Sequence, residues 1–288
     1  MVGLARLVHP FPSALDAVVT LGLALLARAP ADRAAVLAVA MLGIQFSIEA
    51  LNDLLDSPTD KIARRAKPLV EGKIPVRAAG AVVAVTGATG LVLALLAGPF
   101  AALVAAAGYA IGIAYDLRLK ASPWSWLPFA AGIPLLPIFA WVGATGSLPG
   151  PILWLAALGV LGGTALAVAN ALADAERNVA SGTATIATTL GRSSSIRLGA
   201  LLSLTVGGAA MTSVVALAGA VAGTWLAGAG AATLAGGVLL GLRGDLKAGW
   251  EVQVIGIGIL ATGWVAAATT VGLGRSAWSE ESARAHAG

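Results

Sequence analysis

The apolar segments of this chain decide its fold class, because they are too long and too numerous for a water-soluble domain. Hydrophobic residues make up 58% of the sequence and charged residues only 11%, whereas soluble domains carry about 25% charged residues. Nine stretches approach or reach the roughly 20 residues that a helix needs to cross a bilayer. They lie at about 13–29, 34–52, 78–97, 99–115, 124–144, 151–173, 196–222, 224–242 and 253–273. We therefore predict an all-α polytopic membrane protein with about nine transmembrane helices around a central cavity.

The distribution of basic residues predicts the orientation of these helices. If the N-terminus is cytoplasmic and the chain crosses nine times, 14 of the 18 Lys and Arg residues fall on the cytoplasmic side. This bias explains the net charge of +4 and the pI of about 9.9, so nucleic acid is not an expected partner. The absence of cysteine excludes disulfides and thiol catalysis. We expect an integral protein of the plasma membrane with a polar cap and an active site on the cytoplasmic side.

An acidic run follows the second apolar stretch and is the strongest candidate for chemistry. Three of the 14 acidic residues lie within eight positions, at Asp53, Asp56 and Asp60, next to Asn52. On a helix Asn52, Asp56 and Asp60 are one turn apart and share a face, with Asp53 beside them. Their mutual repulsion would be relieved by a divalent cation, and hard oxygen ligands of this kind suit Mg²⁺. The alternative is a solvated acidic helix cap.

Further polar residues are expected on the same side of the membrane, in the loops after the second, fourth and sixth stretches. These are the basic residues Lys61, Arg64, Arg65, Lys67 and Lys73, then Tyr115, Asp116, Arg118 and Lys120, and finally Asn170, Asp174, Glu176, Arg177 and Asn178. Metal-binding carboxylates beside basic side chains are suited to binding a diphosphate. Taken singly, each basic residue is also explained by topology alone.

The spacing of the acidic run occurs twice. Asn52-x3-Asp56-x3-Asp60 is echoed 118 residues later by Asn170-x3-Asp174-x3-Asn178. A transmembrane bundle built from two related halves would bring both copies to one shared cavity. We predict a single domain over residues 1–274, with halves at about 1–122 and 123–274 and a polar tail at 275–288.

Together these motifs resemble the UbiA superfamily of intramembrane prenyltransferases. Its first signature, N-D-x-x-D-x-x-x-D, is complete at Asn52–Asp60. The family's basic loop corresponds to Lys67-Pro68-Leu69-Val70-Glu71-Gly72-Lys73-Ile74, with lysine in place of the usual arginine. A tyrosine-to-basic motif is present at Tyr115–Lys120, and the glycine-threonine-leucine-glycine pattern runs from Gly182-Thr183 to Leu190-Gly191.

The second acidic motif departs from the family pattern. Asn170 and Asp174 remain, while Ala171 and Asn178 occupy positions that are usually acidic. Ala171 cannot bind a metal, and Asn178 offers only a neutral oxygen. Four alternatives follow for this motif: a full two-metal site, a single ion held through Asp174, an atypical reaction, or a loss of catalysis.

The resemblance implies Mg²⁺-dependent transfer of an isoprenyl group from a polyprenyl diphosphate to an aromatic or other lipophilic acceptor, with release of pyrophosphate. It implies catalytic roles for Asp53, Asp56 and Tyr115, with the aromatic face of Tyr115 stabilising positive charge. The alternative for Tyr115 is an ordinary tyrosine at the membrane interface. The implied metal ligands are Asn52, Asp53, Asp56, Asp60, Asn170, Asp174 and Asn178. The implied diphosphate-binding residues are Arg64, Arg65, Lys67 and Lys120. Membrane lipid would surround the prenyl chain.

Four other residues, deeper in the predicted helices or beside the tyrosine, also have an interpretation. Glu49 is costly in a membrane helix, and with Gln45 it is a candidate contact for the acceptor. Asp16 is expected to snorkel or to have a partner, and Asp116 to form a local ion pair with Arg118. The competing functions are a UbiA-type terpene cyclase, a catalytically silent binder of lipid diphosphates and, ranked last, a cation-coupled transporter. Magnesium-dependent pyrophosphate release would separate the transferase from the transporter.

Overall fold

The computed structural model describes residues 7, 10–62, 66–175, 179 and 182–272, and over these residues the chain is helical without a β-strand. The helices are α2 (Pro10–Leu26), α3 (Ala31–Ile62), α4 (Val76–Ala97), α5 (Pro99–Ala114), the π-helix η1 (Tyr115–Leu119), α6 (Leu127–Gly132), α7 (Leu135–Thr145), α8 (Gly150–Ala173), α10 (Ile186–Leu190), α11 (Arg192–Ala218), α12 (Ala222–Leu242) and α13 (Leu246–Thr270). The predicted all-α membrane fold is confirmed.

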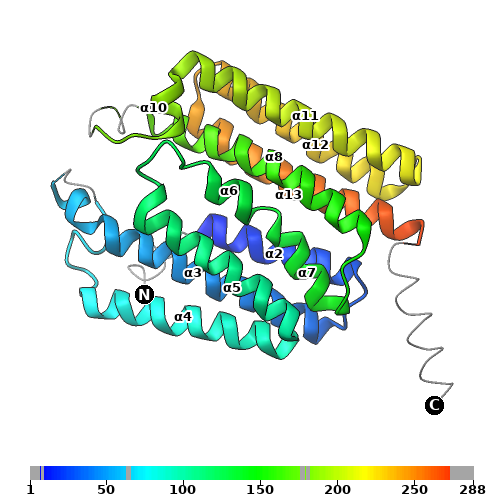
Figure 1. Ribbon diagram of the computed structural model, residues 1–288, viewed down its shortest axis with the longest axis horizontal. Coiled ribbons are helices and arrows are strands. Elements are labelled where there is room, and N and C mark those ends of the chain that lie inside the picture. The colour runs from blue at the N-terminus through cyan, green and yellow to red at the C-terminus, as the bar shows by residue number, and fades with distance from the viewer. Residues whose placement is uncertain (1–6, 8–9, 63–65, 176–178, 180–181, 273–288) are drawn as a thin grey trace.

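The long helices form one bundle, seen from the side in Figure 1. Helices α3, α4 and α5 pack on one another, and α8, α11, α12 and α13 form a second group. Helix α2 joins the two groups, since it contacts α3 and α7 as well as α13. The largest fully buried side chains are Trp141 of α7 and Trp264 of α13, and the Trp264 indole donates to Ser213 Oγ at 2.8 Å.

Eight helical segments in the described part of the chain are long and apolar enough to cross a membrane, against the nine predicted. The difference is α2, which is apolar but has only 17 residues. The predicted stretch 124–144 is also not one helix. It is divided into α6 and α7 around Pro134, because proline has no N–H to continue the hydrogen-bonding pattern.

Helix α3 is longer than predicted and includes the acidic run. It has 32 residues, about 48 Å at 1.5 Å per residue, and continues through Pro58 to Ile62. The hydrocarbon layer is only about 30 Å thick. The apolar stretch 34–52 marks the membrane-spanning part of this helix, not its end, so the predicted end near residue 52 is wrong and the acidic run is helical.

Helices α12 and α13 are in direct backbone contact. A Cβ atom added at Gly230 would lie 2.3 Å from the backbone nitrogen of Leu260, and one added at Gly263 would lie 2.2 Å from that of Ala227. Glycine is therefore required on both helices at these positions, as expected where transmembrane helices approach closely.

Candidate functional site

Lys67 neutralises two of the acidic residues of α3. Its Nζ lies 2.7 Å from Asp53 Oδ1 and 2.8 Å from Asp60 Oδ2. Both carboxylates are buried, with only 2% of each side chain exposed. Burial on its own would lower the pKa of Lys67, but the hydrogen bonds to Asp53 and Asp60 outweigh it and raise the pKa above its ordinary value. Lys67 therefore stays protonated at neutral pH.

Lys120 occupies the corresponding place beside the other two residues of the motif. Its Nζ donates to Asn52 Oδ1 at 2.8 Å and lies 2.5 Å from Asp56 Oδ1. The Asp56 side chain is 29% exposed, so it is the most accessible carboxylate of the motif. The structure thus groups Asp56 with Asn52 and Asp60 with Asp53, where the sequence analysis placed Asn52, Asp56 and Asp60 on one shared face.

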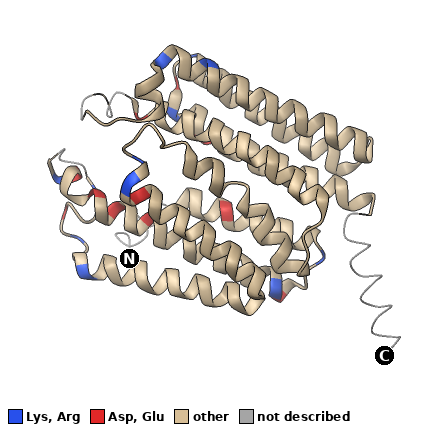
Figure 2. Cartoon of the chain, in the orientation of Figure 1, with Lys and Arg blue, Asp and Glu red and all other residues tan. Residues whose placement is uncertain are grey.

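These residues lie at one end of the bundle. In Figure 2 most of the Lys, Arg, Asp and Glu positions gather at the end where α3 finishes, and long stretches of the other helices carry no charge. The charged residues of this chain are therefore concentrated at the end of the bundle that carries the acidic run.

The segment from Tyr115 to Lys120 is a π-helix instead of the predicted loop. The backbone N–H of Lys120 donates to the carbonyl oxygen of Tyr115, five residues earlier, at 2.9 Å. Because a π-turn holds one more residue than an α-turn, it brings both residues to one side of the helix, and Lys120 reaches α3 from there. The Tyr115 ring packs edge-on against Phe129 at a centroid distance of 5.5 Å.

Asp116 is not paired with Arg118, so that prediction is wrong. Only 4% of Asp116 is exposed, and neither of its carboxylate oxygens has a hydrogen-bond partner among the residues that the structure describes. Arg118 is exposed on the other side of η1. The charged groups that act on the Asp116 carboxylate are Lys120, Glu49 and Asp56.

A polar column continues from the acidic motif into the bundle. Glu49 and Gln45 lie one and two turns deeper on α3, and the Gln45 amide donates to the carboxylate of Asp16 on α2. The prediction that Asp16 has a partner is therefore confirmed. Glu49 lies on α3 between Gln45 and Asp53, and its charge acts on both Asp16 and Tyr115.

An apolar cavity begins at Asp16 and is open on one side; its empty space, counted with the open mouth, is about 740 Å³. Asp16 is the one charged residue among its described lining residues, and the others are aliphatic side chains and glycines from α2, the α6–α7 region, α8, α11 and α13, among them Leu15, Leu136, Leu158, Val206 and Ala261. None of these described lining residues is aromatic. The cavity suits a long aliphatic chain.

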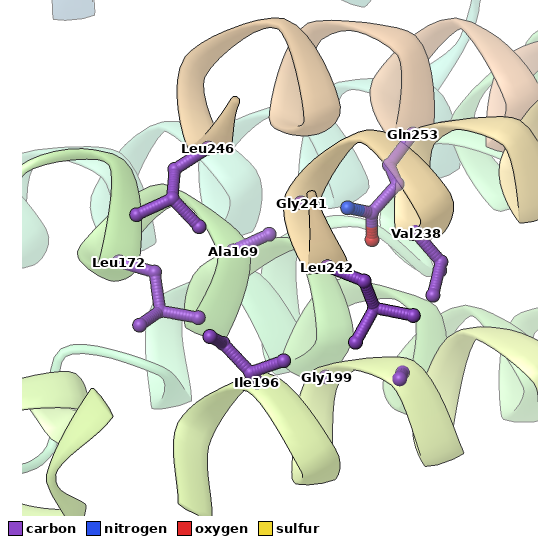
Figure 3. Close-up of a pocket in the computed structure, with 10 residues that line it drawn as sticks. Ala169, Leu172, Ile196, Gly199, Val238, Gly241, Leu242, Leu246 and Gln253 are labelled. Atoms are coloured by element: carbon purple, nitrogen blue, oxygen red, sulfur yellow. The ribbon is translucent and has the colours of Figure 1, made fainter. Parts of the chain in front are cut away.

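A smaller cavity, also open on one side, lies between α8, α11, α12 and α13 (Figure 3), and its empty space with the open mouth is about 360 Å³. Gln253 is the one polar residue among its described lining residues. The Gln253 amide already binds Ser203 Oγ at 3.0 Å and the carbonyl oxygen of Gly249 at 3.2 Å. Its polar groups serve the contact between helices α11 and α13.

The second motif is only partly described. Asn170 lies in the last turn of α8 and Asp174 caps that helix, whereas Asn178 lies outside the described residues, as do Arg64 and Arg65. Ala171 is 7% exposed and packs in an apolar cluster with Val168, Leu172, Ile186 and Ala187. The alanine is therefore part of the core.

The glycine-threonine-leucine-glycine pattern forms the short helix α10. Thr185 caps its first turn through a reciprocal pair of hydrogen bonds with Thr188, and Gly182 and Gly191 adopt positive φ angles of 67° and 78°. Ser125, which follows η1, accepts a hydrogen bond from the Ile186 backbone at 3.2 Å. The pattern thus connects α10 to the segment that carries Tyr115 and Lys120.

The donor set at the acidic end of α3 fits a hard divalent cation. It consists of carboxylate and amide oxygens, which is the set that Mg²⁺ prefers. Within the described ranges no three acidic or histidine side chains converge on one point, and the ammonium groups of Lys67 and Lys120 lie among the oxygens instead. The residues fit a metal provided that these lysines move aside.

The family model of the UbiA prenyltransferase family matches residues 17–251, which covers most of the chain. The chain belongs to the UbiA prenyltransferase family. This UbiA assignment confirms the resemblance and identifies the chain as a prenyltransferase.

Named UbiA relatives agree with the assignment. The chain is 26% identical over 263 residues to the digeranylgeranylglyceryl phosphate synthase of Methanopyrus kandleri, covering 89% of this chain and 94% of the relative. A UbiA homologue from Archaeoglobus fulgidus bound to GPP and Mg²⁺ matches with a TM-score of 0.72 at 17% identity, covering 93% of this chain and 99% of the other. A UbiA homologue from Aeropyrum pernix K1 matches with a TM-score of 0.71 at 22% identity, covering 90% and 97%.

Two acidic residues of this UbiA protein, Asp116 and Asp16, lie near the candidate site but were not among the predicted site residues. The sequence did indicate that Asp116 is unusual, because it is a carboxylate next to the motif tyrosine at the end of an apolar segment. Its partnership with Arg118 was inferred from spacing, and the π-helix changes that spacing. Asp16 could be recognised as costly, but its place at the cavity depends on the packing of α2 against α13.

Proposed function

We propose that this protein transfers an isoprenyl group from a polyprenyl diphosphate to a lipophilic acceptor and releases pyrophosphate. The observation that carries the proposal is a cluster of carboxylates and two lysines at the end of α3, together with an aliphatic cavity that Gln45 of the same helix reaches through Asp16. The cluster matches the head of such a substrate and the cavity its tail. The relatives support the proposal, since one is named a digeranylgeranylglyceryl phosphate synthase and another was solved with GPP and Mg²⁺.

The metal in this proposal is Mg²⁺. Asn52, Asp53, Asp56 and Asp60 would hold it on α3, with Asn170, Asp174 and Asn178 contributing from the second motif. When bound, Mg²⁺ neutralises charge on the diphosphate and makes pyrophosphate a better leaving group.

The basic residues bind and orient the diphosphate. Lys67 and Lys120 are held at the acidic motif, so a short movement of either ammonium group takes it to a phosphate oxygen. Arg64 and Arg65 belong to the same basic stretch of sequence. These cations counter the negative charge that grows on the departing group.

Tyr115 lies where the reacting carbon would enter the membrane part of the site. It shares one side of η1 with Lys120, and its packing on Phe129 holds the ring in place. The ring face stabilises an allylic cation as the carbon–oxygen bond breaks. Exclusion of water by the surrounding apolar helices protects that cation from hydrolysis.

For the acceptor, we favour an aliphatic lipid alcohol of the glyceryl phosphate type over an aromatic ring. The relative from Methanopyrus kandleri, which is named a digeranylgeranylglyceryl phosphate synthase, supports this choice. Gln45 and Glu49 lie between the cavity and the diphosphate site, where they can bind an acceptor hydroxyl. We also propose that the acidic end of the bundle faces the cytoplasm and that the two halves of the chain are related.

Incubation of the detergent-purified protein with Mg²⁺ and geranylgeranyl diphosphate tests the proposal. We expect pyrophosphate release that requires both the metal and one acceptor from a panel of glyceryl phosphate lipids and aromatic acids. Release without any acceptor would indicate a terpene cyclase. Binding of the diphosphate without release would indicate a silent binder and would refute the transferase.

The cavity predicts a dependence on donor length. Replacing Ala261 by phenylalanine fills part of the cavity, so KM for geranylgeranyl diphosphate should rise about tenfold while KM for geranyl diphosphate changes little. The matched control is Ala232→Phe, at an exposed position on α12, which should leave both values unchanged. An equal effect of Ala261→Phe on both donors would place the prenyl chain elsewhere.

A further inference from the structure

Asp116 is a buried carboxylate that nothing in the described structure satisfies. It is 4% exposed, and both of its oxygens lack a hydrogen-bond partner among the described residues. A buried carboxylate in that condition is costly, and such groups are normally hydrogen-bonded, paired or bound to a metal. Within the membrane-embedded region such residues are retained for function more often than for stability.

Among the described residues, the charged groups that act on the Asp116 carboxylate are mostly acidic. They are Glu49, Asp56 and the ammonium group of Lys120, so with Asp116 itself three acids face one cation there. Lys120 is already engaged with Asn52 and Asp56. An approaching diphosphate adds further negative charge, and when Lys120 turns toward it Asp56 loses its ion pair and Asp116 loses the attraction of that ammonium group. A divalent cation at Asp56 and Asp116 would offset this excess.

The second motif gives an independent reason to expect a carboxylate here. Position 171 is an alanine packed in the apolar cluster of α8 and α10, and position 178 is an asparagine. Two ligand positions are therefore weakened or absent on that side of the site. Asp116 belongs to η1, and the π-turn between Tyr115 and Lys120 determines the position of its side chain.

Resting on the proposed function, we propose that Asp116 is a metal-ligating carboxylate that replaces the acidic ligands missing at Ala171 and Asn178. It binds the divalent cation together with Asp56 once Lys120 has moved to the diphosphate. The second metal of this chain is therefore held mainly by η1 and α3 instead of by the end of α8.

The test measures metal binding directly, in the full-length protein in detergent. Free Mn²⁺ is quantified by electron paramagnetic resonance during titration in the presence of inorganic pyrophosphate, and the thermal midpoint is measured without metal. The variants are Asp116→Asn, which keeps the shape of the side chain, and Asp245→Asn. The second is a matched control, because Asp245 caps α13 far from η1 in sequence and asparagine caps equally well.

We expect two Mn²⁺ ions per wild-type chain, and at least about tenfold weaker binding of one of them in Asp116→Asn. The metal-free thermal midpoint should stay the same or rise, because the variant removes a buried, unsatisfied charge. A lower midpoint would indicate a structural role, and unchanged binding of both ions would also overturn the proposal.

An Asp56→Ala variant separates this proposal from the function on which it rests. If Asp56→Ala weakens Mn²⁺ binding and Asp116→Asn does not, only the role of Asp116 is refuted. If neither variant affects Mn²⁺ binding, the acidic motif is not the metal site and the proposed function fails with it.

Discussion

An Asp56→Ala variant should release pyrophosphate at least about 1,000-fold more slowly than the wild-type protein under saturating Mg²⁺ and prenyl diphosphate. Asp56 is the most accessible carboxylate of the motif, since 29% of its side chain is exposed against 2% for Asp53 and for Asp60. Lys67 bridges the two buried acids. Asp56 is therefore the carboxylate of the motif that is best placed to bind a metal–diphosphate complex. The rate of pyrophosphate release measures the effect of removing it.

The fold should survive this substitution. In this variant Lys120 still donates to Asn52, and the carboxylate of Asp116 still acts on it, so the cation keeps a partner. Asp32→Ala is the matched control, because it removes an exposed carboxylate from the first turn of the same helix, 24 positions earlier. It should retain full activity. Pyrophosphate release by Asp56→Ala at more than a tenth of the wild-type rate would exclude an essential role for this residue.

A Gly230→Ala variant should lower the free energy of unfolding by about 3 kcal/mol or more. The added Cβ would lie 2.3 Å from the backbone nitrogen of Leu260 and 2.6 Å from its Cα, and backbone atoms cannot rotate away. Helices α12 and α13 would have to separate along the contact that includes Gly263. Thermal unfolding in detergent, followed by circular dichroism, measures the effect.

Gly236→Ala provides the comparison for this prediction. Gly236 lies on the same helix, and an added Cβ there meets nothing within 4 Å. Alanine should stabilise the helix by up to about 1 kcal/mol, because glycine is the poorer helix former. Equal destabilisation by both variants would show that the loss comes from the helix itself and not from the α12–α13 contact.

The sequence predicted the fold class and the location of the chemistry because both leave a strong local pattern. Apolar stretches of about 20 residues indicate transmembrane helices, and most of their centres were correct. Their limits were less accurate. Helix α3 continues ten residues past the predicted end, through Asp53, Asp56 and Asp60, because a helix can leave the hydrocarbon layer without ending. Pro134 divided another stretch into α6 and α7.

The arrangement within the site could not be predicted from spacing. A regular helical repeat placed Asn52, Asp56 and Asp60 together. In the structure the two lysines determine which acidic residues are paired, and they lie 14 and 64 residues downstream of the carboxylates that they bind. The π-turn at Tyr115 shifts the register of Lys120 by one residue. Neither effect is encoded in a motif, since both depend on which helices pack against α3. The sequence showed that Ala171 cannot bind a metal, but it did not show that this residue packs in the apolar core.

The two lysines have a consequence for how the protein is made. Lys67 follows Asp53 by 14 residues and closes a short loop, so the two most buried acids can be neutralised soon after the end of α3 has been synthesised. Lys120 reaches Asp56 only after α4 and α5 have been added. The nascent chain can therefore insert and assemble this acidic helix end from its own side chains, before any metal ion is acquired.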